Sequence, residues 1–165
     1  MTVLLVYLPF SLVLVAIQST FFGRIGLAGG RADLVLLSLV LFTLLAGRRQ
    51  ATVAAVVVAP FYDLMSGLPV GTSVLPFLAA VYLAGMGERT LFGARFGWPI
   101  LLTFIAAVVV GLITVAEIAL LGHSVAWDQT ILRAIVPSAL LNAVCILPLY
   151  LAAESLRQRR LPVSR

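Results

Sequence analysis

Apolar runs fill this sequence from near Val3 to near Ala153, and only short polar segments separate them. Hydrophobic residues make up 62% of the 165 residues and charged residues only 10%, so the chain has too little polar surface to coat a soluble domain. A helical run of about 20 apolar residues crosses the roughly 30 Å hydrocarbon core of a bilayer. The sequence therefore predicts an all-α integral membrane protein with a single transmembrane domain over residues 1–165.

The apolar runs predict six transmembrane helices with no soluble domain between them. The first run is predicted to be a span and not a secretory signal, because it lacks a basic start and a small-residue cleavage site. The second, third and fourth spans have only about 15 residues each, which implies a locally thin bilayer or burial among neighbouring helices. The predicted spans cover residues 3–22, 33–47, 51–65, 73–87, 98–121 and 130–153, and a basic cytoplasmic tail covers 154–165.

The basic residues are all arginines, and their positions predict the orientation of the chain. If the N-terminus is cytoplasmic, the outer loops hold only Arg24 and Arg31, with Arg133 just inside the sixth span. The positive-inside rule then places both termini in the cytoplasm. Topology therefore explains the net charge of +5, and we expect no nucleic-acid partner. The inner arginines are Arg48, Arg49, Arg89, Arg95, Arg157, Arg159, Arg160 and Arg165.

The segment from Pro60 to Leu78 brings together an acid, a tight turn and prolines. Asp63 lies near the end of the third span, close to hydrocarbon and to the negative end of a helix dipole, so we expect it to have a partner. Gly67 followed by Pro69 predicts a helix stop, because glycine adopts the left-handed cap conformation at no steric cost. With Ser73 as N-cap, the next helix begins at once. The segment therefore forms a corner between two short helices, on the predicted outer face.

Glu117 and Arg133 are predicted to form an ion pair between the fifth and sixth spans. They lie at similar depths in an antiparallel hairpin. A single charge at the bilayer centre costs about 2.5 to 3.5 kcal/mol, so pairing is favoured. Asp63 is expected to join them from the same outer layer. We expect such a cluster to lock helices together, and a proton or ion relay is the alternative.

The other reactive residues predict no catalytic, cofactor or metal site. Cys145 lies in an apolar run without metal-ligand spacing, which is typical of a small buried hydrophobe. His123 is expected to be solvated in an outer loop, and Asn142 is expected to donate a hydrogen bond between helices. The sequence offers no nucleophile and base set and no nucleotide-binding loop, so we expect a non-enzymatic protein.

The segment from Arg31 to Gly87 resembles the MreD family of bacterial rod shape-determining membrane proteins. It has a D-L pair that opens the second span, then a basic turn, then a D-x-x-S-G-x-P-x-G corner. A proline usually precedes the aspartate of the D-L pair, and Ala32 stands there instead. The rest of the chain matches only in length, hydropathy and basic tail. The corner residues are Asp63, Ser66, Gly67, Pro69 and Gly71.

This resemblance implies a multi-pass protein of the bacterial inner membrane that has no cofactor and acts in the cell-elongation machinery. The implied partners are MreC, through its transmembrane helix, together with RodA, a penicillin-binding transpeptidase and, indirectly, MreB. With these partners it would help to control cell shape and lateral peptidoglycan synthesis. The implied fold is similar to the substrate-binding S components of energy-coupling-factor vitamin transporters. The interface candidates are the five corner residues and the third and fourth helices; lipid contact is also expected, and a homodimer is left open.

The alternative function is a vitamin-binding S component of that same transporter fold. Short, proline-interrupted spans around the corner favour it, because transporter sites are built into such helices. Against it, the first span contains only Ala16 where those subunits carry an Ala-x-x-x-Ala docking motif. A small channel or lipid carrier is a third class, supported only by the predicted layer of Asp63, Glu117 and Arg133.

Overall fold

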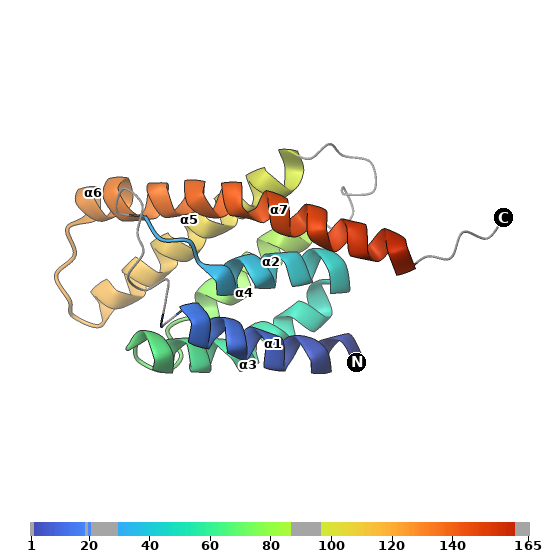
Figure 1. Ribbon diagram of the computed structural model, residues 1–165. Helices are drawn as coiled ribbons and strands as arrows, with labels where there is room; N and C mark the ends of the chain where they lie inside the picture. Colours follow the sequence, from blue (N-terminus) through green and yellow to red (C-terminus); the bar gives the residue numbers. More distant parts are fainter. Residues whose placement is uncertain (1, 19, 21–29, 87–96, 161–165) are drawn as a thin grey trace.

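The computed structural model describes residues 2–18, 20, 30–86 and 97–160, and most of these residues are helical. The last three elements follow one another without a break, so the described residues form six helical rods (Figure 1). The elements are α1 (Thr2–Ile17), α2 (Leu34–Ala46), α3 (Arg48–Ser66), α4 (Val74–Met86), α5 (Gly97–Leu120), α6 (Trp127–Thr130), the π-helical turn η2 (Ile131–Ile135) and α7 (Val136–Arg160).

Two of these rods are long and apolar enough to cross a membrane. They are α5, with 24 residues, and the rod from Trp127 to Ala152, with 26 residues. Three further apolar helical stretches are shorter, namely Tyr7–Ile17, α2 and α4. The all-helical class predicted from the sequence is therefore confirmed for the described residues. That all six rods cross the membrane stays a prediction.

The helix bounds differ from the predicted spans mainly at two places. The third helix begins at Arg48 and not near Ala51, because Gly47 has φ 89° and turns the chain directly into α3. The last helix continues to Arg160, so much of the predicted tail is helical. The predicted span ends at Phe22 and Gly87, the loop arginines Arg24, Arg89 and Arg95, and the tail residues 161–165 lie outside the described residues.

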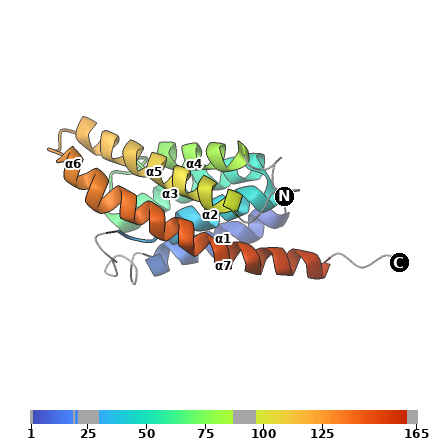
Figure 2. The ribbon, with the colours of Figure 1, turned by 90° about the horizontal axis from the view of Figure 1, so that it is seen from above.

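Helix α2 is the centre of the molecule and packs against α1, α3, α4, α5 and α7. Its side chains from Val35 to Val40 are almost entirely buried. On one side α1 and α3 lie along each other, as Figures 1 and 2 show, and the Tyr7 ring stacks on Phe42 of α2 at 3.9 Å. On the other side α4, α5 and α7 meet α2 through alanines, which allow close helix contact. These alanines are Ala80, Ala84, Ala106, Ala107 and Ala139.

The segment that precedes α2 passes directly over the backbone of the last rod. A Cβ atom on Gly30 would lie 2.6 Å from both the Pro137 carbonyl carbon and the Ser138 backbone nitrogen. Proline lacks an N–H, so Pro137 leaves the carbonyl of Arg133 without its usual helical partner. The π-helical turn η2 ends at Ile135, two residues before Pro137, and the Val136 N–H bonds to the Ile131 carbonyl. The absence of a side chain at Gly30 therefore allows the segment before α2 to pack closely against the backbone of α7.

We predict that Gly30→Ala destabilises the protein, because the clashing atoms are backbone and cannot rotate away. Overpacking of this kind costs about 1 to 3 kcal/mol. The matched control is Gly97→Ala, since a Cβ atom there would meet nothing within 4 Å. Heating the detergent-solubilised variants and measuring the folded fraction by size-exclusion chromatography should show a lower midpoint for Gly30→Ala alone. Equal midpoints for the two variants would contradict the close packing.

Candidate functional site

The corner between α3 and α4 is built around the carboxylate of Asp63, which is fully buried. Its Oδ2 accepts hydrogen bonds from the backbone N–H of Gly71 at 2.7 Å and of Ser73 at 3.2 Å. Its Oδ1 lies 3.1 Å from the same Ser73 nitrogen. The predicted partner of Asp63 therefore exists, but it is the backbone of the turn and not a cation.

The turn itself follows the predicted chemistry. Gly67 ends α3 in the left-handed conformation, with φ 72°, and its N–H bonds to the Asp63 carbonyl. Gly71 has φ 106°, a value that side-chain-bearing residues rarely adopt. α4 begins at Val74, so Pro76 occupies the third helical position, where its missing N–H has no helical partner to lose. Asp63 is a residue of α3, but its carboxylate bonds to the Ser73 N–H just before α4. The carboxylate therefore lies at the start of α4, where the helix dipole favours negative charge.

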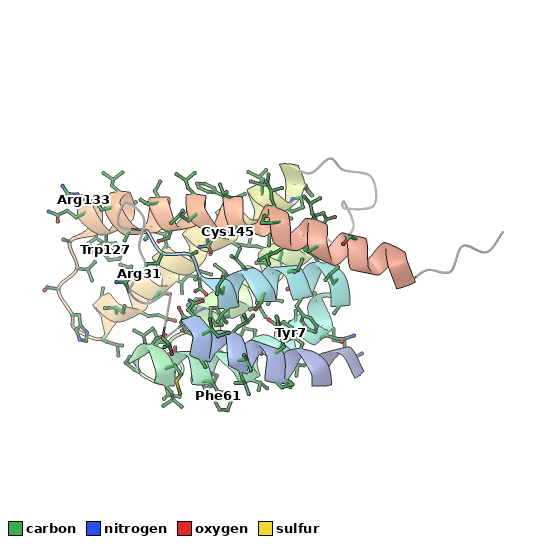
Figure 3. The ribbon with its side chains drawn as sticks, viewed as in Figure 1. Tyr7, Arg31, Phe61, Trp127, Arg133 and Cys145 are labelled. Carbon is green, nitrogen blue, oxygen red and sulfur yellow. The ribbon has the colours of Figure 1, made fainter. Side chains whose placement is uncertain are left out.

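The predicted ion pair between Glu117 and Arg133 is wrong for the described structure. Arg133 is exposed, and Figure 3 shows it near the start of the last rod, pointing away from the bundle. Glu117 on α5 is partly buried, and its Oε2 has no hydrogen-bond partner. Similar depth is not sufficient for pairing, because Arg133 lies on a different side of its rod. Asp63 is close enough to Glu117 for their charges to interact, but its carboxylate bonds to the backbone of the corner and forms no ion pair with Arg133.

A second acid, the partly buried Asp33, lies at the start of α2 and bonds to groups of three helical segments. Its Oδ1 accepts from the Leu36 N–H at 2.9 Å, which makes Asp33 the N-cap of α2. The same oxygen accepts from Gln18 Nε2, just after α1, at 3.0 Å. Its Oδ2 accepts from the Tyr62 hydroxyl of α3 at 3.1 Å. One carboxylate therefore connects the ends of α1, α2 and α3.

Further hydrogen bonds extend this connection to α7. Gln18 Oε1 accepts from the N–H of Leu34 at 2.6 Å and thereby supports the first turn of α2. Asn142 Oδ1 accepts from the Asp33 N–H at 2.9 Å, and Ser138 Oγ accepts from the Arg31 N–H at 2.9 Å. Asn142 thus bonds between helices as an acceptor, not as the predicted donor. We call this set the Asp33 network; it comprises Gln18, Arg31, Asp33, Tyr62, Ser138 and Asn142.

The Asp33 network lines a cavity of about 400 Å³. Apolar side chains of α2 and α5, including Leu36 and Val110, form other parts of its wall, and Ser66 of the corner also contributes. Its polar and apolar lining could hold a small hydrogen-bonding molecule. Among the described residues no group of three or more His, Cys, Asp and Glu side chains could hold a metal ion. Of the predicted site residues, only Ser66 lies at this cavity.

The fold and these clusters define a small helical membrane protein in which two acids, the buried Asp63 and the partly buried Asp33, bond to the ends of the protein's own helices. A family model described as rod shape-determining protein MreD matches residues 1–160. The chain therefore belongs to the MreD family of rod shape-determining proteins. No curated protein and no solved structure matches it. Similarity to transporter S components, expected from the resemblance, stays a prediction.

We predict that Asp63→Asn lowers thermal stability, because an amide NH₂ group would face the backbone donors of Gly71 and Ser73. Hydrogen bonds to a charged group contribute about 1.5 to 3 kcal/mol each, so a loss of about 2 kcal/mol is expected. Asp128→Asn is the matched control, because Asp128 is exposed on α6. The measurement is the unfolding midpoint of both variants in the same detergent. Two variants with the wild-type midpoint would show that the corner does not depend on this carboxylate.

Proposed function

We propose that this protein is a non-enzymatic component of the bacterial cell-elongation complex that binds the transmembrane helix of MreC. Through that contact it would help to control cell shape and lateral peptidoglycan synthesis, alongside RodA, a penicillin-binding transpeptidase and MreB. The observation that carries the proposal is the family match over residues 1–160. The internal bonding of Asp33 and Asp63 supports it, because a protein whose polar groups bond to one another has mainly apolar surface left for partners.

The proposed MreC interface is the outward face of α3 together with the corner that follows it. Apolar side chains are exposed along this face at helical spacing, and Figure 3 shows Phe61 pointing away from the bundle. The corner continues this surface with Val70, which is 63% exposed. Helices in lipid associate through close van der Waals packing, so such a face suits a second helix. The exposed residues of α3 are Val53, Val56, Val57, Phe61, Leu64 and Met65.

We further propose that the six rods form one transmembrane domain of the inner membrane with both termini in the cytoplasm. The start of α1 and the end of α7 lie at the same end of the bundle (Figure 1), as an even number of crossings requires. The start of α3, whose first two residues are Arg48 and Arg49, lies at that end as well. Arginines concentrated there are consistent with the positive-inside rule.

The interface is tested by placing a bulky apolar side chain on α3. We expect Val56→Trp to reduce co-purification of MreC by at least about tenfold, because the indole separates the two helices that must pack closely. Val144→Trp is the matched control, since Val144 is an exposed valine of α7 on another side of the bundle. Both variants stay apolar, so both should insert and fold. Equal MreC recovery with both variants would exclude the α3 face, and no recovery with the wild type would exclude MreC binding.

A second candidate function, substrate binding as a transporter S component, is favoured by the cavity of about 400 Å³. Hydrogen-bonding groups at its wall, among them Asp33, Tyr62 and Asn142, could orient a small polar molecule. Mass spectrometry of the purified protein separates the two functions. A small molecule retained by the wild type, in the absence of any co-purifying MreC, would favour the transporter.

A further inference from the structure

An arginine at the start of α3 is held in place without an acidic partner among the described residues. The Arg48 guanidinium lies over the Tyr82 ring of α4, 4.6 Å from its centroid. The stem of Arg48 crosses Gly85, where a Cβ atom would lie 2.7 Å from Arg48 Cδ. Arg48 is exposed, and no ion pair joins it to any described residue. The side chain is therefore oriented in advance by packing and a cation–π contact, while its charge is left unneutralised.

The charge at this position is unfavourable for the protein taken alone. Arg49 follows directly and is also exposed. Both arginines lie in the first turn of a 19-residue helix that has no acidic residue in that turn and no side-chain cap. The positive end of the helix dipole repels cations, and neighbouring guanidinium groups repel each other. An anion supplied from outside the chain would relieve both effects.

The surroundings of the two arginines indicate where such an anion comes from. They begin α3, and the start of α3 lies at the end of the bundle (Figure 1), where a membrane protein meets the lipid headgroups. Next to them, Tyr82 and Met86 of α4 are more than half exposed, at 55% and 62%, and lie one turn apart. Leu75, two turns before Tyr82, is 56% exposed. An apolar strip along α4 therefore starts at the arginines and runs toward the other end of the helix.

We propose that Arg48 and Arg49 bind the phosphate of an anionic phospholipid whose acyl chain lies along the exposed strip of α4. Arginine suits this role because its planar group can donate two parallel hydrogen bonds to phosphate oxygens. Tyr82 fixes the guanidinium at headgroup depth, and the strip supplies the apolar contact that a free phosphate ion lacks. The site does not require MreC, so it stands independently of the proposed partner.

Native mass spectrometry of the detergent-purified protein, mixed with equal phosphatidylglycerol and phosphatidylcholine, tests the site. The wild type is expected to retain phosphatidylglycerol in preference, by about fivefold for each arginine. The double variant Arg48→Gln/Arg49→Gln should lose this preference. Arg133→Gln, which removes an exposed arginine at the opposite end of the bundle, should keep it.

The test also includes the variant Tyr82→Leu and a competition with inorganic phosphate. Tyr82→Leu changes an exposed side chain, so it should fold even if the double arginine variant does not, and it is expected to weaken the preference. Inorganic phosphate should not displace the bound lipid. A wild type without preference, a preference that survives both Arg48→Gln/Arg49→Gln and Tyr82→Leu, or an equal loss in Arg133→Gln would overturn the lipid site. Displacement by phosphate would assign the arginines to a free anion.

Discussion

The structure depends on the hydrogen bonds of one partly buried carboxylate, that of Asp33. It caps α2, the central helix, and also holds Gln18 next to α1 and Tyr62 of α3. An acid next to hydrocarbon is costly unless its lone pairs are bonded, and here several donors share that task. Because α2 touches five other helices, the position of its first turn determines how both halves of the bundle meet.

The carboxylate of Asp63 is stabilised in the same way, by backbone N–H groups at the start of α4. Each of these two acids lies where a helix begins, accepts backbone N–H groups, and experiences the favourable end of a helix dipole. Among the described residues, no arginine side chain bonds to either acid. This leaves Arg48 and Arg49 available for contacts outside the chain, and beyond this first turn the exposed surface of α3 is mainly apolar. The acids therefore bond within the protein, while apolar and basic side chains remain exposed for partners and lipid.

The sequence predicted the parts of this arrangement that depend on near neighbours. The helix stop at Gly67 and the start of α4 after Ser73 both follow from residues within a few positions of one another. The partners Gln18, Tyr62 and Asn142 were not predicted, because they are distant in sequence and meet Asp33 only through packing.

The predicted pair of Glu117 and Arg133 failed for a related reason. The prediction considered only the depth of each residue along its rod, whereas the side of the rod on which a residue lies depends on helix packing and on the π-helical turn before Pro137. Residue spacing in the sequence does not predict how the π-helical turn and helix packing rotate a residue around its rod. The family, in contrast, was predictable from the D-x-x-S-G-x-P-x-G corner, because this motif is a local property of the chain.

A double-mutant cycle between Asp33 and Tyr62 tests most directly whether internal polar bonding holds the helices together. Asp33→Ala, Tyr62→Phe and the combined variant would be unfolded by SDS in mixed micelles, and their free energies of unfolding compared. Because the cap of α2 is lost in both variants that carry Asp33→Ala, the cycle isolates the contact between α2 and α3. We expect a coupling of about 1.5 kcal/mol or more, as for a hydrogen bond to a charged group. Effects that add to within about 0.5 kcal/mol would contradict the account.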